Sequence, residues 1–274
     1  MQFKSRGSAQ AIFLAAAVVL VMTGCGGSDN QASSDSPIES IVVPTDGHEL
    51  IRVMHDRYSQ DWYETLTFEQ EVIEYRATGT DTSTWYEAMK IPGLLRIDMN
   101  APSSGNGYIF RNDSLYVLEG GDITSARPTL HPLLLLGFDV YRMPPVELSV
   151  RLDSLGFDLS ILTDGMWEGK EVYVVGAAPG ETGKAQFWIE KERLVFVRML
   201  QPAGPDGNGT SEVQFNKYEP LGNAWISPEV VFFFNGTMTM IERYANMRVG
   251  DDLDEALFVP STALTTEHWL SSPE

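Results

Sequence analysis

The chain has a single cysteine among its 274 residues, which excludes an intramolecular disulfide framework and any zinc site built from several cysteines. Basic residues are also scarce: 19 Lys and Arg stand against 38 Asp and Glu, a formal net charge of −19. A surface of that sign repels phosphate backbones, so we expect no nucleic-acid partner. Neither a Gly-X-Y period nor sustained heptads occur, which excludes collagen-like and coiled-coil folds.

Motifs of common enzyme sites are missing as well. The sequence has no His-Glu-x-x-His zinc helix, no Gly-x-Ser-x-Gly nucleophile elbow and no Gly-x-x-x-x-Gly-Lys phosphate loop. Of the four histidines, His48 and His55 are seven residues apart and could share a helix face, but no further metal ligands accompany them at a suitable spacing. We therefore expect no catalytic residue, no metal and no cofactor.

The chain begins with a positively charged segment followed by an apolar run. Lys4 and Arg6 precede the run from Ala11 to Met22, which is almost entirely Ala, Val, Leu, Ile and Phe. As a helix this run would span about 18 Å, against roughly 30 Å of membrane hydrocarbon. It is too short for a comfortable membrane span and is typical of a secretory signal peptide.

The residues at the end of this run, Met22-Thr23-Gly24-Cys25, resemble a bacterial lipobox, although Met22 stands where Leu is usual. The resemblance implies that residues 1–24 are a lipoprotein signal peptide, that cleavage falls between Gly24 and Cys25, and that Cys25 is acylated and holds the protein on a membrane. Gly26 after the cysteine resembles outer-membrane rather than inner-membrane sorting signals. The expected location is therefore the bacterial cell envelope, at the outer membrane facing the periplasm. An ordinary signal peptide with a chance cysteine is the alternative.

Composition and periodicity divide the remaining chain. Residues 25–47 are rich in Gly, Ser, Asp, Asn and Pro and predict a lipidated flexible tether. Residues 48–60 carry apolar side chains at helical spacing, with Thr45 and Asp46 as candidate caps. Residues 48–261 predict one globular domain, and residues 262–274 predict a loose C-terminal tail.

Within the predicted domain, most of the chain has the period of two that is typical of strands. The exception is the segment 128–157, where Pro132 and Pro144-Pro145 precede apolar residues at helical spacing. Val146, Leu148, Leu152 and Leu155 are expected to share one buried face of the second helix. Short Gly- and Asn-rich turns connect the strand segments, so neighbouring strands should pair antiparallel. We expect a mainly β (α+β) fold: one curved antiparallel sheet of about ten or eleven strands, covered by an N-terminal helix and a central helical insert.

Four short segments, Gly169–Val175, Gln186–Lys191, Phe196–Arg198 and Asp254–Pro260, resemble LolA-like and LolB-like outer-membrane lipoprotein-sorting proteins in content and order. The likeness extends over roughly residues 48–261. It implies an unclosed half-barrel whose concave face is covered by helices, with acyl chains held between the two. Two differences stand out: soluble carriers of this family have no lipid anchor, whereas LolB-like acceptors do, and Glu190 stands where Asp is commoner.

An acyl chain in water costs roughly 0.8 kcal/mol per methylene, so a carrier needs a concave apolar surface. Candidate lining residues are apolar side chains of the predicted strands and of the insert. On the strands they are Trp85, Leu95, Ile97, Tyr108, Phe110, Phe187, Ile189 and Phe196; on the insert they are Leu133, Leu134, Leu136, Phe138, Met143, Leu148 and Leu152. Plain core is the alternative for each, because a slip of one residue reverses which strand face points inward.

These observations predict a monomeric membrane-anchored lipoprotein, not an enzyme. Its partner would be an acylated lipoprotein or a lipid, bound by the acyl chains for lipoprotein sorting or lipid transfer. An envelope stress sensor and a structural or scaffold lipoprotein without lipid cargo are the alternatives.

Overall fold

The computed structural model of the chain describes residues 43–204 and 207–271. The predicted signal peptide, its cleavage site at Gly24 and Cys25, and most of the predicted tether lie outside this range. Within it, no helix has both the length and the apolar character needed to cross a membrane.

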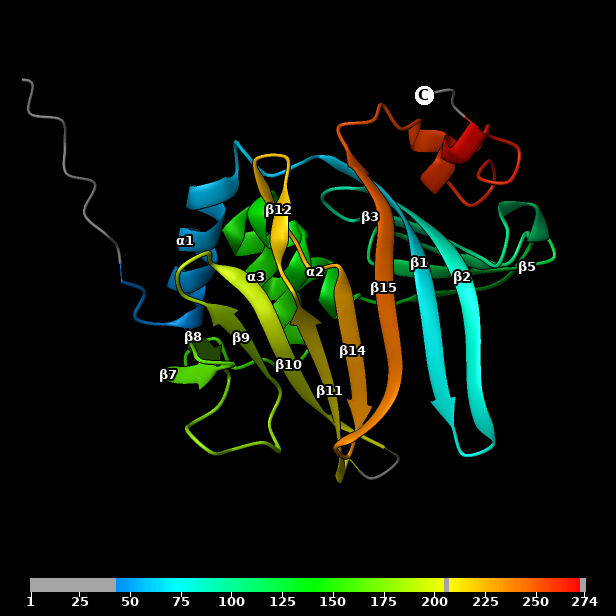
Figure 1. Cartoon of the computed structure of the whole chain (residues 1–274). Helices are drawn as coiled ribbons and strands as arrows, with labels where there is room; N and C mark the ends of the chain where they lie inside the picture. Colours follow the sequence, from blue (N-terminus) through cyan, green and yellow to red (C-terminus); the bar gives the residue numbers. More distant parts are fainter. Residues whose placement is uncertain (1–42, 205–206, 272–274) are drawn as a thin grey trace, which may run out of the picture. The chain divides into compact units, whose positions relative to one another are not determined.

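The described chain is dominated by one large antiparallel sheet of 13 strands (Figure 1). Its order is β6-β5-β4-β3-β2-β1-β15-β14-β11-β10-β9-β8-β7, and β6 and β7 do not pair with each other. The sheet is therefore an unclosed half-barrel, which confirms the predicted fold. The strands on one side are β1 (Thr65–Arg76), β2 (Gly79–Lys90), β3 (Leu94–Met99), β4 (Gly107–Arg111), β5 (Ser114–Glu119) and β6 (Asp122–Pro128). Those on the other side are β7 (Leu162–Trp167), β8 (Lys170–Val175), β9 (Gln186–Glu190), β10 (Val195–Ala203), β11 (Gly209–Asn216), β14 (Glu229–Phe234) and β15 (Thr237–Val249).

The structure has more strands than the sequence predicted. Strand β6 lies at the sheet edge and is exposed at almost every position, so it lacks the apolar alternation by which strands are recognised. The separate hairpin of β12 (Glu219–Leu221) and β13 (Ala224–Ile226) has strands of only three residues. The turn Asn112-Asp113 joins β4 to β5, and both residues have the positive φ that tight hairpin turns require.

Three α-helices cover the concave face of the sheet: α1 (Gly47–Tyr58), α2 (Pro132–Gly137) and α3 (Pro145–Ser154) (Figure 1). Four 3-10 helices accompany them: η1 (Pro102–Ser104), η2 (Asp139–Tyr141), η3 (Glu255–Phe258) and η4 (Trp269–Ser271). The side chain of Asp46 accepts a hydrogen bond from the Glu49 amide at 2.8 Å and so caps α1, as predicted.

Aromatic packing joins α1 to the insert. The Trp62 and Tyr141 rings stack with centroids 3.5 Å apart, and Tyr58 meets Tyr141 edge-on at 5.4 Å. The Tyr58 and Tyr141 hydroxyls donate to the carbonyls of Arg193 and Leu194 at 2.7 and 3.1 Å. These contacts fix both helical segments to the turn between β9 and β10.

On α3 the predicted buried face was partly wrong. Leu148 and Leu152 are fully buried, but Val146 is 79% exposed. Val146 and Leu148 are two residues apart and therefore lie about 200° apart around a helix, so they cannot share a face.

Glu190, the residue found where the resemblance favours Asp, ends β9 and is 2% exposed. Its carboxylate accepts hydrogen bonds from the backbone amides of Glu192 and Arg193 at 2.7 and 3.1 Å, and it also pairs with the Arg193 side chain. Glu190 thus holds the turn from β9 to β10, onto which α1 and the insert pack.

The C-terminal segment, predicted to be loose from residue 262, packs on the sheet face opposite the helices. Ala263 is fully buried beside Ile109, and Trp269 is buried with Phe258 against Ala88 of β2. The described body therefore continues well beyond residue 261.

A buried ion cluster fastens this segment to β3. The Arg96 guanidinium binds both carboxylate oxygens of Asp98, at 2.8 and 2.9 Å, and both residues are about 2% exposed. Arg96 also donates to the Ala263 carbonyl at 2.7 Å, and His268 Nε2 lies 3.0 Å from Asp98. Burial alone would raise the pKa of Asp98, but the hydrogen bonds from His268 and Arg96 outweigh it and lower the pKa.

We predict that Asp98→Asn destabilises the protein by about 3–5 kcal/mol, because it leaves the Arg96 guanidinium buried without its counter-charge. Urea unfolding of the full chain at pH 7 measures the loss. The matched control is Glu255→Gln, which removes the exposed ion pair with Arg111 and should cost less than about 1 kcal/mol. Equal losses in the two variants would contradict the assignment. Since the folded-state pKa of Asp98 is lowered, its contribution should be present at neutral pH and disappear in acid.

Candidate functional site

A cavity of about 220 Å3 lies between the concave face of the sheet and α2. Its lining comes from both halves of the sheet and from the segment that begins α2. From β2 and β3 the lining residues are Trp85, Glu87, Met89, Leu95 and Ile97; from the insert they are His131, Leu133, Leu134 and Phe138; from β11, β14 and β15 they are Phe215, Phe232, Met240, Glu242 and Tyr244. The sheet register accounts for this wall, since Leu95 lies opposite Met89, Ile97 opposite Glu87, and Phe232 opposite Met240.

The cavity is mainly apolar and has partly exposed side chains at its edge. Leu95, Leu134 and Phe138 are buried, whereas Trp85, Leu133, Phe232, Met240 and Tyr244 keep part of their surface exposed. An apolar ligand that covers these side chains would gain about 25 cal/mol for each Å2 of apolar surface removed from water. The geometry therefore suits an apolar chain.

The volume sets a limit on what fits. Pockets for drug-sized ligands typically have roughly 300–1,000 Å3, and the cavity here has about 220 Å3. It accommodates part of a long acyl chain with α2 in its present position. Because α2 has only six residues and contributes Leu133 and Leu134 to the lining, a movement of this helix would change the cavity most directly.

The structure distributes the residues predicted from sequence over three environments. Those in the cavity are Trp85, Leu95, Ile97, Leu133, Leu134 and Phe138. Those in the closed core are Leu136, Leu148, Leu152, Phe187, Ile189 and Phe196, with Tyr108 packed at its edge. Phe110 and Met143 line a second pocket. That any of these side chains contacts a ligand stays a prediction.

Sequence reasoning missed the polar members of the cavity wall. Glu87 is 5% exposed and Gln70 of β1 is fully buried, between Trp85 of β2 and Tyr244 of β15 in the register. A signal was available, because Glu87 lies between Trp85 and Met89 at the period of two and so shares their inward face. An acidic residue on an otherwise apolar strand face indicates a buried carboxyl group.

Two carboxyl groups in this wall have strongly altered acidity. Burial, reinforced by the charge of Glu242, raises the pKa of Glu87 well above its usual range. Burial also raises the pKa of Glu242 to about 8, against a smaller opposite effect of the nearby Gln70 amide. Glu242 is therefore largely protonated at neutral pH, and burial favours the neutral form of Glu87 as well.

His131 lies at the boundary between the cavity and the second pocket. Its Nδ1 accepts a hydrogen bond from the Leu134 amide at 3.1 Å and caps α2, and its ring meets Phe110 edge-on at 4.6 Å. Burial lowers the pKa of His131 to about 4. At neutral pH the ring is uncharged and, because Nδ1 accepts, the proton is on Nε2.

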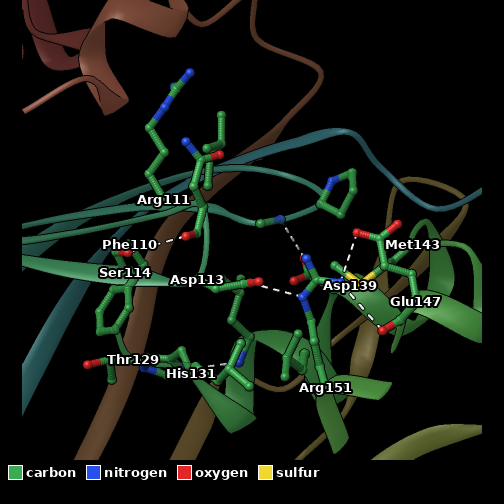
Figure 2. A pocket seen from close by; sticks show the side chains of 17 residues that line it. Phe110, Arg111, Asp113, Ser114, Thr129, His131, Asp139, Met143, Glu147 and Arg151 are labelled. Atoms are coloured by element: carbon green, nitrogen blue, oxygen red, sulfur yellow. Dashed lines mark hydrogen bonds and ion pairs between the residues drawn. The ribbon is translucent and has the colours of Figure 1, made fainter. Parts of the chain in front are cut away.

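The second pocket, of about 200 Å3, lies between the β4–β5 turn and α3 and is polar (Figure 2). Arg151 donates to Asp113 at 2.9 Å and to Glu147 at 2.8 Å, so its charge is compensated. Asp139 is fully buried; its Oδ1 accepts from the Gly93 amide at 2.9 Å, and burial raises its pKa to about 7. This pocket suits a polar ligand rather than an acyl chain. In the part of the chain that the structure describes, no three His, Cys, Asp or Glu side chains are arranged to hold a metal ion.

We predict that Glu242→Gln flattens the pH dependence of stability. With a folded-state pKa of about 8, Glu242 stays protonated while the unfolded chain ionises above about pH 4.5, so native stability falls as the pH rises from 4.5 to 8. The variant should gain about 4 kcal/mol at pH 8 and nothing at pH 4. Urea unfolding at the two pH values measures this. Glu71→Gln, on the opposite, exposed face of β1, is the control and should leave the dependence unchanged. An unchanged slope in Glu242→Gln would contradict the assigned environment.

No protein-family model and no curated protein matches the sequence. Solved structures do match. A DUF1329 family protein from Desulfovibrio piger is 16% identical with a TM-score of 0.54, and the match covers 77% of this chain and 95% of that one. The LolA superfamily protein NE2245 from Nitrosomonas europaea is 10% identical with a TM-score of 0.51, over 76% of this chain and 96% of that one.

A third solved structure, a domain named as an outer membrane lipoprotein-sorting protein from Vibrio parahaemolyticus, is 11% identical with a TM-score of 0.54. That match covers 80% of this chain and 98% of the other. Identities of 10–16% establish a shared fold and no more. The resemblance predicted from the sequence is therefore confirmed for the fold. The described body shares its fold with these three solved structures.

Proposed function

We propose that this protein binds the acyl chains of a lipoprotein or a lipid in the cavity between the sheet and α2, for lipoprotein sorting or lipid transfer in the bacterial cell envelope. The observation that carries the proposal is the apolar cavity itself, whose edge keeps Trp85, Leu133, Phe232 and Met240 partly exposed. An acyl chain seated there would cover these side chains and remove its own methylenes from water, at about 0.8 kcal/mol each.

Two further observations support this ligand class. The cavity wall carries no Lys or Arg side chain, so nothing in it favours a charged metabolite over an apolar chain. The solved structures that share the fold include one named for lipoprotein sorting. By this proposal, α2 with Leu133 and Leu134 covers the chain and moves to admit it.

The proposal includes a membrane anchor at acylated Cys25 and a location at the outer membrane, facing the periplasm. Its support is the sequence Met22-Thr23-Gly24-Cys25 after an apolar run. In this arrangement residues 25–47 form a flexible tether that lets the monomeric folded domain extend away from the membrane. The excess of acidic residues keeps the body off anionic lipid surfaces and leaves the acyl group as the anchor.

A structural lipoprotein without cargo is the second candidate. It is favoured by the volume of about 220 Å3, which is below the usual range of ligand pockets, and by the closed packing around Phe187, Ile189 and Phe196.

The test places the photoreactive amino acid benzoylphenylalanine at Leu133 in the full chain, produced in bacterial cells that are then irradiated. If the cavity holds acyl chains, mass spectrometry of the purified protein should show covalent adducts that contain them. The matched control carries the same amino acid at Val146, which is 79% exposed on α3 and should give few such adducts. Equal yields at the two positions, or no acyl adduct at Leu133, would favour the structural lipoprotein.

A further inference from the structure

The wall of the apolar cavity contains one polar group of side chains, which we call the acidic patch: Gln70, Trp85, Glu87 and Glu242. In the register Gln70 lies directly opposite Trp85, while Glu87 and Glu242 lie opposite Phe68 and Val72, its neighbours on the same face of β1. The two carboxyl groups are thus on the strands that flank β1, with the Gln70 amide between them. Three of the four residues line the cavity directly, and Gln70 is buried beneath them.

The polar atoms of this patch lack partners. Gln70 Nε2, Gln70 Oε1 and the indole nitrogen of Trp85 are buried without a hydrogen bond to any residue that the structure describes. Gln70 approaches Glu242 without reaching hydrogen-bond geometry. Glu87 is 5% exposed and lines the cavity beside Trp85. Native proteins rarely leave such groups unpaired, so a group of this size indicates that a ligand supplies the partners.

The charges around the patch restrict the ligand. The groups that face the carboxyls are each other, Tyr244 of β15 and His131 at the start of α2, and no Lys or Arg side chain lines the cavity. Burial keeps His131 uncharged and raises the pKa of Tyr244 well above its usual range, so neither supplies a charge at neutral pH. A phosphate or carboxylate placed here would be buried beside acidic groups with no counter-charge.

What the patch offers at neutral pH is mainly donors. The Trp85 indole N–H, the Gln70 amide N–H groups and the O–H group of protonated Glu242 all need an acceptor. The carbonyl oxygen of an ester or amide is an acceptor without charge, and in an acylated molecule it is attached directly to the apolar chain that the cavity suits.

We propose that the acidic patch binds the uncharged carbonyl group of an acyl ester or acyl amide, while the attached chain lies in the apolar part of the cavity. This inference rests on the proposed function, which concerns the chain alone. The patch fixes how deep the chain enters and selects acylated molecules over free fatty acids. Charged parts of such a ligand, a phosphate or a peptide, remain outside the cavity.

The test compares ten-carbon probes that differ in the polar group: decanamide, methyl decanoate, decanoate and decylamine. Binding to the purified full chain, held in amphipol so that no detergent competes, is measured by titration calorimetry at pH 7 and pH 9. The uncharged probes should bind about tenfold or more tightly than decanoate at pH 7, the effect of one unpaired buried charge. Their affinity should fall about tenfold at pH 9, where Glu242 ionises and ceases to donate.

Variants separate the patch from the chain-binding wall. Glu242→Gln keeps a donor at every pH, so it should bind the uncharged probes at pH 9 as tightly as at pH 7. Glu71→Gln, on the exposed face of β1, should retain the fall at pH 9. A preference for decanamide over methyl decanoate would indicate an N-acylated protein as the source of the carbonyl, and the reverse preference a glyceride lipid.

Three results would overturn the inference. Decanoate binding as tightly as the uncharged probes would show that the patch does not select against charge. Tightest binding of decylamine would show that the carboxyls hold a cation instead. If none of the four probes binds, both this inference and the proposed function fail, whereas the first two results leave chain binding intact.

Discussion

The burial of short helices against the concave face of one open sheet is the constraint on which the rest of this structure depends. The sheet ends at β6 and β7 without closing, so the apolar side chains of its inner face need another cover. Helices α2 and α3, of six and ten residues, are too short to be stable alone and form because Leu134, Leu148 and Leu152 are buried against that face. Sheet and helices therefore stabilise each other.

The helices do not pack equally closely against all parts of the sheet. Around β9 and β10 the packing is close, with Phe187, Ile189 and Phe196 fully buried. Under α2 the fit is incomplete, and Trp85, Phe232 and Met240 keep exposed surface around the cavity. The close-packed strands β9 and β10 thus stabilise the fold, whereas the strands beside α2 border a cavity where a ligand can add contacts.

The two faces of the sheet differ in how buried ionisable side chains are paired. On the outer face Arg96, Asp98 and His268 satisfy one another and fasten the C-terminal segment. On the inner face no Lys or Arg of the described residues lines the cavity with Glu87 and Glu242, so burial raises the pKa of both carboxyl groups. The outer cluster stabilises the folded chain. On the inner face, the polar atoms of Gln70 and the indole nitrogen of Trp85 remain without a hydrogen-bond partner among the described residues.

The sequence by itself determined the antiparallel sheet, the N-terminal helix with Thr45 and Asp46 as candidate caps, and the helical insert, because these follow from local periodicity and turn chemistry. It named Trp85, Leu95 and Ile97 as candidate lining residues but left open which face of their strands points inward. It could not reveal β6, whose exposed side chains have no apolar period, nor the docking of residues 262–271, whose partners Ala88 and Ile109 are far away in the chain.

Only the tertiary structure decided which apolar residues surround a cavity and which complete a core. Leu134 and Leu136 are two residues apart in one short helix, yet only Leu134 lines the cavity. It also placed Glu87 and Glu242, which are far apart in the chain, on the two strands that flank β1, on the same face of the sheet as Gln70. The physical reason is the same in both cases: local preference sets the period of a segment, but whether space remains beside a side chain depends on what distant segments place there.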